Sequence, residues 1–516
     1  MKGHVDFTYE VSRSLRACQG AVLLVDASKG IQAQTMANFW LAFNQDLTMI
    51  PVLNKIDLPG SNIEKTKQDI QTQFELNDCL SISAKNGINV ESVLEAVIER
   101  IPCPKGSIDN ELKCLLFDCW YDEYKGTICM ISVIDGILKK GDIIESKQKG
   151  TKHQILEIGV LTPEMTSLEC LRAGQVGFII CGMKTTKEAL IGDTFCTPNS
   201  RVEAVSGFQQ PRPMVYSGIF PADASEYSML ETEIQKLLLN DSSVSIENDS
   251  SHALGRGFRA GFLGVLHMDV FKERLENEHN MSVIATNPTV PFKILFKNGE
   301  EKVFTNPIDF PDFKDSFQVA DVQEPFVLTT VITPREYLGK VIKLCNEFRG
   351  IQEGLEFMED SALLKFRMPL NEIVSEFYDR LKSVSSGYAT FEYDDPIYES
   401  SDICKVGLLI NGEAVDALSQ VCHRTRSLNT AKELVRRLAS VIKRHQFEIT
   451  VQAKVDSQIV AKQKIKQLRK DVTAKCYGGD GTRKKKLLDA QKEGKKKMRM
   501  IGSVEVGPEA FLRILT

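Results

Sequence analysis

The chain has 516 residues, of which 42% are hydrophobic and 26% charged, and this length is enough for several globular domains. No run of about 18–20 apolar residues occurs, so the sequence predicts no membrane-spanning helix. The net charge is −5, but residues 461–500 hold 15 Lys and Arg against 4 Asp and Glu, which places +11 on this segment and −16 on the rest. An acidic body with a basic tail predicts a polyanionic partner for the tail.

The cysteines carry little information about function. The thirteen Cys form no Cys-x-x-Cys pair and no cluster at zinc-ligand spacing. We therefore expect reduced, mostly buried thiols in an intracellular compartment, and no protein-bound metal.

Residues 1–104 alternate apolar runs with helical patterns. The runs cover 20–27, 49–57 and 79–85, and the helical patterns include 38–44, 63–74 and 90–100. This alternation predicts a parallel sheet with helices on its faces, in which 20–27 is a buried strand. Pro102 and Pro104 then mark a linker.

The rest of the chain divides into four regions and a connector. Residues 105–207 show short strands between turn signals such as Asp135-Gly136, which predicts a small β-barrel. Residues 208–292 and 325–402 each follow the order strand, helix, strand, strand, helix, strand. This order predicts two ferredoxin-like βαββαβ domains, joined by a connector at 293–324. Residues 403–516 contain a hairpin signal at Asn411-Gly412, a helical pattern at 430–443 and the basic tail. The expected fold class is a multidomain α/β and α+β protein.

The strongest local motif is Asn54-Lys55-Ile56-Asp57, at the end of an apolar run. It resembles the Asn-Lys-x-Asp motif with which Ras-type GTPases recognise guanine. In those proteins the carboxylate, here Asp57, accepts hydrogen bonds from guanine N1–H and the 2-amino group, which adenine does not offer. Asn54 would brace the loop, and the stem of Lys55 would cover the base. The alternative is a polar loop with no ligand.

A second motif, Ser83-Ala84-Lys85, follows the next apolar run. In the GTPases that it resembles, the backbone N–H at the Ala position donates to guanine O6. Ligands of such sheets bind at the carboxyl ends of the strands, where both motifs fall. We therefore expect GTP as the cofactor, with its base held by both loops.

The motif that would bind the phosphates does not occur in these residues. The sequence has no Gly-x-x-x-x-Gly-Lys-Ser/Thr, the loop that supplies a backbone cradle and a Lys for the phosphates and a hydroxyl for Mg²⁺. Gly3-His4 resembles the end of the Asp-x-x-Gly-His motif of translational GTPases, in which Gly contacts the γ-phosphate and His positions the attacking water. We expect these roles for Gly3 and His4, and no Mg²⁺ ligands. We also expect an N-terminally truncated chain, without P-loop and switch I, which alone binds GTP very weakly and does not hydrolyse it measurably.

Further matches cover most of the chain. The matching segments are residues 3–7 and 9–15, 31–35, 239–241, 261–264 and 266–268, 386–389, 474–480 and 483–488. Together they resemble the LepA family, also called elongation factor 4, and the last two resemble its own C-terminal domain. The domain order is similar to that of elongation factor G without its decoding-site domain. Residues 290–292 look closer to the mitochondrial branch.

The resemblance implies a GTP-dependent, ribosome-binding translational GTPase. It implies a fidelity factor that catalyses one-codon back-translocation of tRNAs on improperly translocated ribosomes. The implied partners are the large-subunit factor site, ribosomal RNA and tRNA. The implied location of this monomer is the matrix side of the mitochondrial inner membrane, with a bacterial-type cytoplasm or a plastid as alternatives. The alternative function is a ribosome- and RNA-binding fragment without GTPase activity.

The basic tail is the candidate RNA-binding segment. Its Lys and Arg would contact RNA phosphates without selecting a sequence, whereas the alternative is a solvated run of charge. The expected contacts are Lys475, Arg483, Lys484, Lys485, Lys486, Lys495, Lys496 and Lys497.

Overall fold

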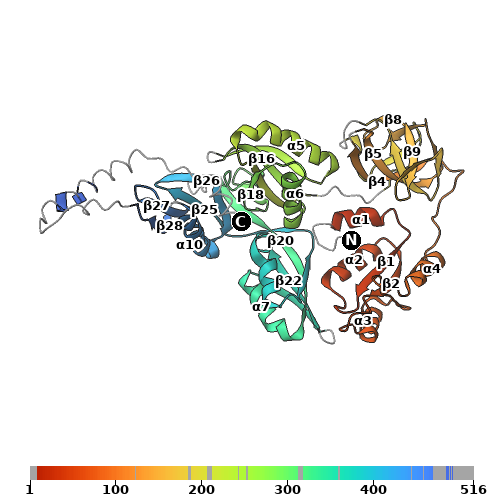
Figure 1. The fold of residues 1–516 in the computed structure, drawn as a ribbon, viewed down its shortest axis with the longest axis horizontal. Coiled ribbons are helices and arrows are strands. Elements are labelled where there is room, and N and C mark those ends of the chain that lie inside the picture. Colours follow the sequence, from red (N-terminus) through yellow and green to blue (C-terminus); the bar gives the residue numbers. More distant parts are fainter. Residues whose placement is uncertain are drawn as a thin grey trace.

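A computed structural model describes most of the chain. The described residues are 8–122, 124–183, 188–205, 212–241, 243–251, 254–311, 318–357, 361–442, 444–456, 458–468, 484–486, 488–489 and 491. They form a row of compact units, in which the first unit lies beside a barrel and the C-terminal unit lies at the opposite end (Figure 1). The expected fold class, multidomain α/β and α+β, is confirmed.

The first unit is built on a parallel sheet in the order β1-β2-β3. Its elements are α1 (Thr8–Leu15), β1 (Gly20–Asp26), α2 (Ala33–Phe43), β2 (Thr48–Asn54), α3 (Ile63–Phe74), β3 (Leu80–Ser81) and α4 (Val90–Arg100). The expectation that 20–27 is a buried strand holds for one face only. Val25 is buried, whereas Val22 and Leu24 are 39% and 55% exposed. The reason is that α4 packs on Ile50 and Val52 of β2 and leaves this face of β1 uncovered.

The second unit is the barrel, an antiparallel sheet in the order β10-β9-β12-β5-β4-β13-β7-β8 with a separate pair β11-β6. Its strands are β4 (Lys113–Asp122), β5 (Gly126–Asp135), β6 (Ile137–Lys139), β7 (Ile143–Ser146), β8 (Lys152–Gln154), β9 (Glu157–Leu161), β10 (Met165–Ser167), β11 (Cys170–Arg172), β12 (Val176–Ile180) and β13 (Thr194–Cys196). An ion pair of 3.2 Å between Arg13 of α1 and Asp118 of β4 joins the barrel to the first unit.

The first ferredoxin-like unit has the sheet order β15-β16-β14-β17, with antiparallel pairs throughout. Its elements are β14 (Val215–Pro221), η3 (Ala224–Glu226), α5 (Tyr227–Asn240), β15 (Ser245–Ser251), β16 (Gly255–Phe262), α6 (Val265–Asn277) and β17 (Val283–Ala285). The stripe that predicted α5 is confirmed, because Leu230, Ile234 and Leu237 are buried against the sheet.

The second ferredoxin-like unit contains a larger sheet than expected. Its elements are β18 (Phe292–Phe296), β19 (Glu301–Phe304), β20 (Val319–Pro334), η5 (Arg335–Tyr337), α7 (Leu338–Glu347), β21 (Ile351–Phe357), β22 (Ser361–Pro369), α8 (Leu370–Glu372), η6 (Ile373–Phe377), α9 (Tyr378–Val384), β23 (Thr390–Tyr393) and β24 (Ile397–Ser400). The expectation of a connector at 293–324 is wrong for its described residues, because β18 and β19 extend the sheet. The first part of β20 pairs with β18, and Ile294 and Phe304 lie in the same core cluster as Val331.

The C-terminal unit is a sheet in the order β26-β25-β27-β28 with one helix. Its elements are β25 (Ile403–Ile410), β26 (Glu413–His423), α10 (Arg424–Val441), β27 (Ile449–Val455) and β28 (Gln458–Ile465). The predicted hairpin is present, and Asn411 and Gly412 have the positive φ angles, 52° and 99°, of a type I′ turn. The helix begins at Arg424, earlier than predicted, because the His423 side chain caps it by accepting from the Thr425 N–H. Within the described ranges, no helix is long and apolar enough to cross a membrane.

Candidate functional site

The two predicted guanine-recognising loops lie side by side at the carboxyl ends of β2 and β3. β2 ends at Asn54, and the parallel register with β3 brings Ser83 close to the same edge of the sheet. Backbone hydrogen bonds join the loops, because the Ile82 N–H donates to the Leu53 carbonyl at 2.7 Å. The sheet therefore places both motifs at one site.

Asn54 holds the two loops together. Its Oδ1 accepts from the backbone N–H of Lys55 at 2.8 Å and from that of Ala84 at 3.0 Å. This is the bracing geometry that the sequence led us to expect. It also means that the Ala84 N–H already has an acceptor, so a guanine O6 at this position would share that donor with Asn54.

Asp57 and Ser83 form the second link between the loops. The Ser83 hydroxyl donates to Asp57 Oδ1 at 2.7 Å, and Ser83 is fully buried while Asp57 is exposed. This hydrogen bond lowers the pKa of Asp57, with a smaller contribution from the charge of Lys85. Asp57 is therefore an ionised, acceptor-only group at neutral pH, which is the chemistry that guanine N1–H and the 2-amino group require.

Lys55 is held by a residue that the sequence had not indicated. Its ammonium contacts Asp26 Oδ2 at 2.6 Å, and its backbone has a φ of 65°. Burial raises the pKa of Asp26, but hydrogen bonds from Lys55 and Ser28 outweigh this, so the pKa is lowered overall. Asp26 ends β1 and lies opposite Asn54 in the register of β1 and β2. In the sequence, the position of Asp26 at the end of an apolar run was the available signal for a site residue. Recognising it as the partner of Lys55 required knowing that β1 lies next to β2.

The other predicted site residues are not brought to these loops by the described part of the chain. Gly3, His4, Lys475, Arg483, Lys495, Lys496 and Lys497 lie outside the described residues. Lys484, Lys485 and Lys486 are described and helical, and the last two are exposed. Among the described residues, no group of three or more His, Cys, Asp or Glu is arranged to hold a metal ion.

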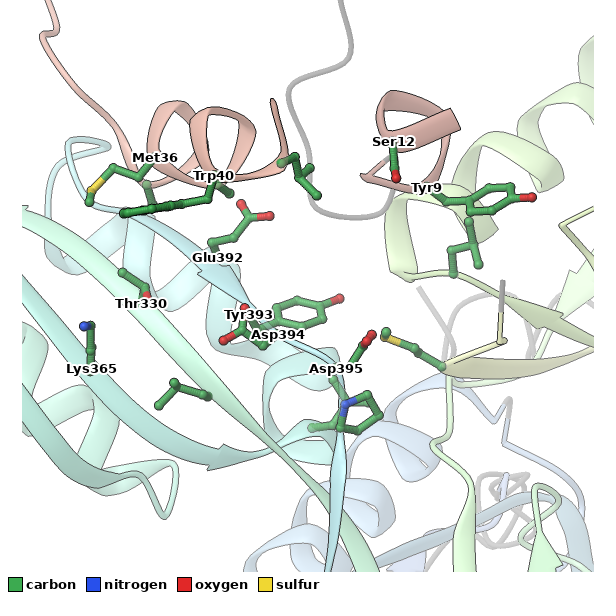
Figure 2. Close-up of a pocket in the computed structure, with 18 of the residues that line it drawn as sticks. Tyr9, Ser12, Met36, Trp40, Thr330, Lys365, Glu392, Tyr393, Asp394 and Asp395 are labelled. Atoms are coloured by element: carbon green, nitrogen blue, oxygen red, sulfur yellow. The ribbon is translucent and has the colours of Figure 1, made fainter. Parts of the chain in front are cut away.

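A cavity of about 2250 Å³ is lined by residues of the first unit and of both ferredoxin-like units. Figure 2 shows Met36 and Trp40 of α2 on one side and Thr330, Lys365 and Glu392 of the sheet on the other. The residues of the two loops do not line it. The cavity is therefore separate from the candidate guanine site, and its mixed acidic, basic and aromatic lining selects no single class of ligand.

Four family models match the chain. The model of the elongation factor Tu GTP binding domain matches residues 1–103, and that of elongation factor Tu domain 2 matches 126–196. The model of the elongation factor G C-terminus matches 321–406, and that of the GTP-binding protein LepA C-terminus matches 410–516.

Whole proteins are similar over almost all of the chain. The "Translation factor GUF1 homolog, mitochondrial" of Arabidopsis thaliana is 50% identical over 516 residues, which cover 99% of this chain and 78% of that protein. The "Translation factor GUF1, mitochondrial" of Homo sapiens is 49% identical over 524 residues, with coverages of 99% and 78%. A crystal structure of a Thermus thermophilus protein matches with a TM-score of 0.55 and 16% identity, over 77% of this chain and 86% of that chain. This last likeness concerns the fold alone.

Proposed function

Because this chain belongs to the LepA family of translation factors, we propose that it is a ribosome-associated translational GTPase of mitochondrial protein synthesis. The observation that supports it best is the joined pair of loops, in which the exposed carboxylate of Asp57 is ionised and fixed by Ser83. A carboxylate held in this way favours guanine over adenine.

The proposed roles of the site residues follow from this geometry. Asp57 accepts from the guanine N1–H and 2-amino group, Ala84 donates its N–H toward O6, and Asn54 braces both loops. Ser83 fixes Asp57, and Lys55 and Lys85 flank the base. Gly3 and His4 are proposed, from family resemblance, to contact the γ-phosphate and to position water. Mg²⁺ would neutralise phosphate charge, but the described residues include no group of three or more His, Cys, Asp or Glu that could hold it, so we assign it no step.

We further propose that the protein promotes GTP-dependent back-translocation of tRNAs by one codon on improperly translocated ribosomes. Family membership supports this fidelity role. We propose that it acts as a monomer at the large-subunit factor site, on the matrix side of the inner membrane. The names of its relatives, which include the word mitochondrial, support the proposed location in mitochondria.

A second candidate function is binding to the ribosome and RNA without GTP hydrolysis. It concerns these 516 residues by themselves, which include no Gly-x-x-x-x-Gly-Lys-Ser/Thr. The two candidates are separated by the rate of ribosome-stimulated phosphate release from GTP. A rate comparable to that of a LepA protein with an intact phosphate loop would exclude the binding-only function, and background release with retained ribosome binding would support it.

The basic tail provides a test of ribosome association. Replacing Lys484, Lys485 and Lys486 by Glu is expected to weaken co-sedimentation with ribosomes, because three phosphate contacts become repulsive. The slope of log affinity against log salt concentration should become shallower by about 2 to 3. A matched control replaces three exposed barrel lysines, Lys139, Lys140 and Lys152, by Glu. If both triple variants behave like the unchanged chain across the salt series, the tail has no RNA role.

A further inference from the structure

Two cysteines of the C-terminal unit face each other across a hairpin. Cys404 of β25 and Cys422 of β26 are direct partners in the antiparallel register. Residues opposed in this way have Cα atoms about 4.5–5.5 Å apart, which lies within the range that a disulfide requires. The Cys404 thiol also donates to the Cys422 carbonyl at 3.5 Å. The backbone is therefore already placed for a bond between the two sulfur atoms.

The pair lies where β26 runs into helix α10. Cys422 is followed by the cap residue His423 and by Arg424, the first residue of the helix. The helix N-terminus and the Arg424 guanidinium both favour a thiolate at this point. The contact with the Cys422 thiol lowers the pKa of Cys404 in spite of burial, with help from Arg424 and against a smaller effect of Asp456. The same contact raises the pKa of Cys422. Of the two thiols, Cys404 therefore has the larger thiolate fraction, and Cys422 is the one that keeps its proton.

A second pair in the same chain has the same register but a different environment. Cys119 of β4 and Cys129 of β5 are direct partners and are buried. Burial raises the pKa of both thiols, that of Cys119 to about 11, and Asp118 adds to the effect at Cys119. The register places Cys119 and Cys129 opposite each other, but the Cys119 thiol donates to the Ala189 carbonyl, and the raised pKa values keep both thiols protonated at neutral pH. They provide an internal control for the role of the environment at Cys404.

We propose that Cys404 and Cys422 are a redox modification site, at which a small peroxide forms a reversible disulfide between β25 and β26. The Cys404 sulfur attacks one oxygen of hydrogen peroxide, the O–O bond breaks, and Cys404 becomes a sulfenic acid as one water is released. The Cys422 sulfur then attacks the Cys404 sulfur, the S–O bond breaks, and a second water leaves. The two thiols lose two electrons and two protons, and the peroxide is reduced to two waters.

The position of this bond gives it a structural consequence. Cys404 follows Ser401 by three residues, and Ser401 bonds to the buried Glu324 of the second ferredoxin-like unit. A disulfide would therefore fix the end of the C-terminal sheet that adjoins this unit. A small oxidant suits the site, because Cys404 is 2% and Cys422 8% exposed.

The test oxidises the full 516-residue chain with hydrogen peroxide at about neutral pH. Remaining thiols are blocked with N-ethylmaleimide at timed intervals, and the unreduced digest is analysed by mass spectrometry. The peptide that links Cys404 to Cys422 is expected to form at least about tenfold faster than the peptide that links Cys119 to Cys129, because the thiolate fraction differs. Dithiothreitol should restore both thiols. Equal rates for the two pairs, or no linked Cys404 peptide, would overturn the proposal.

Two single variants assign the steps within the pair. In Cys422→Ala, the Cys404 sulfenic acid has no partner and should accumulate as a dimedone adduct. In Cys404→Ala, Cys422 should give no more adduct than Cys129 does. Labelling of Cys422 in preference to Cys404 would reverse the assigned order and contradict this part of the proposal. Because the comparison of the two pairs uses the unsubstituted chain, it does not depend on the folding of either variant.

Discussion

Replacing Asp57 by Asn is expected to change the base preference of the site from guanine to xanthine. Guanine offers an N1–H and a 2-amino group, and both need acceptors such as a carboxylate. Xanthine carries an oxygen at position 2, which needs a donor, and the Asn side-chain amide supplies one acceptor and one donor. Because two hydrogen bonds to the base change, the ratio of guanine affinity to xanthine affinity is expected to fall by a factor on the order of ten to a hundred.

In the structure, Asp57→Asn leaves the other hydrogen bonds of the two loops in place. Asn keeps the size of Asp and an oxygen that still accepts from the Ser83 hydroxyl, which now contacts Asp57 Oδ1 at 2.7 Å. The brace between Asn54 and Ala84 is not touched. A change in base preference would therefore report on the base-recognising contact and not on a collapsed loop.

The measurement is a ligand-observed NMR titration of the chain with GDP and with XDP, which remains informative when binding is weak. The control is Asp78→Asn, an exposed position before β3 outside both loops, where both nucleotides should bind as to the unsubstituted chain. If the ratio of GDP to XDP affinity is the same in Asp57→Asn and the unsubstituted chain, Asp57 does not contact the base.

Much of the candidate site could be predicted from the sequence, because its parts are local. Asn54 and Ser83 each come at or just after the end of a strand, and parallel strands bring their ends to one edge. The ion pair between Lys55 and Asp26 could not be predicted in this way. It joins residues 29 positions apart, and it depends on β1 lying next to β2 in a register that opposes Asp26 to Asn54.

The units with clear periodic patterns were likewise predictable, but two boundaries were not. Residues 293–324 look polar because β18 and β19 lie at the margin of a sheet, where Leu295 and Val303 stay partly exposed. β18 pairs with β20, and β20 continues without a break into the ferredoxin-like part, so no turn marks the boundary. Helix α10 begins before its apolar stripe does. Its first turns carry Arg424, which pairs with Asp402 just before β25, and Arg426, which pairs with Glu372 of α8.

Replacing Arg349 by Met is expected to destabilise the second ferredoxin-like unit by about 3–5 kcal/mol, because it leaves a buried carboxylate without its cation. Glu324 is fully buried and accepts from the Arg349 guanidinium and from Ser401. The same guanidinium lies 3.8 Å from Glu372, which is also buried and pairs with Arg426 of α10. The network therefore joins β20 and α8 to the C-terminal unit.

Met is the appropriate replacement because of the backbone at this position. Arg349 has a φ of 61°, a region that costs most side chains some free energy and costs glycine none. Arg349→Gly would relieve that cost and obscure the loss of the ion pair. Arg349→Met keeps the backbone cost and most of the stem, so the measured difference reports on the charge.

The measurement is native-state hydrogen exchange of peptides from β20 and β22, because a multidomain chain does not unfold as one unit. The control is Arg380→Met in the same unit. Arg380 pairs with Glu347 at 2.7 Å, but both side chains are more than 40% exposed, and such pairs contribute about 0–1 kcal/mol.

The double variant Arg349→Met with Glu324→Gln should recover a large part of the loss, since the buried charge is then removed. A single variant no more destabilising than Arg380→Met would show that water or a rearranged Arg426 satisfies Glu324. In that case the network would contribute little to holding the second ferredoxin-like unit against the C-terminal unit, which precedes the basic tail in the chain.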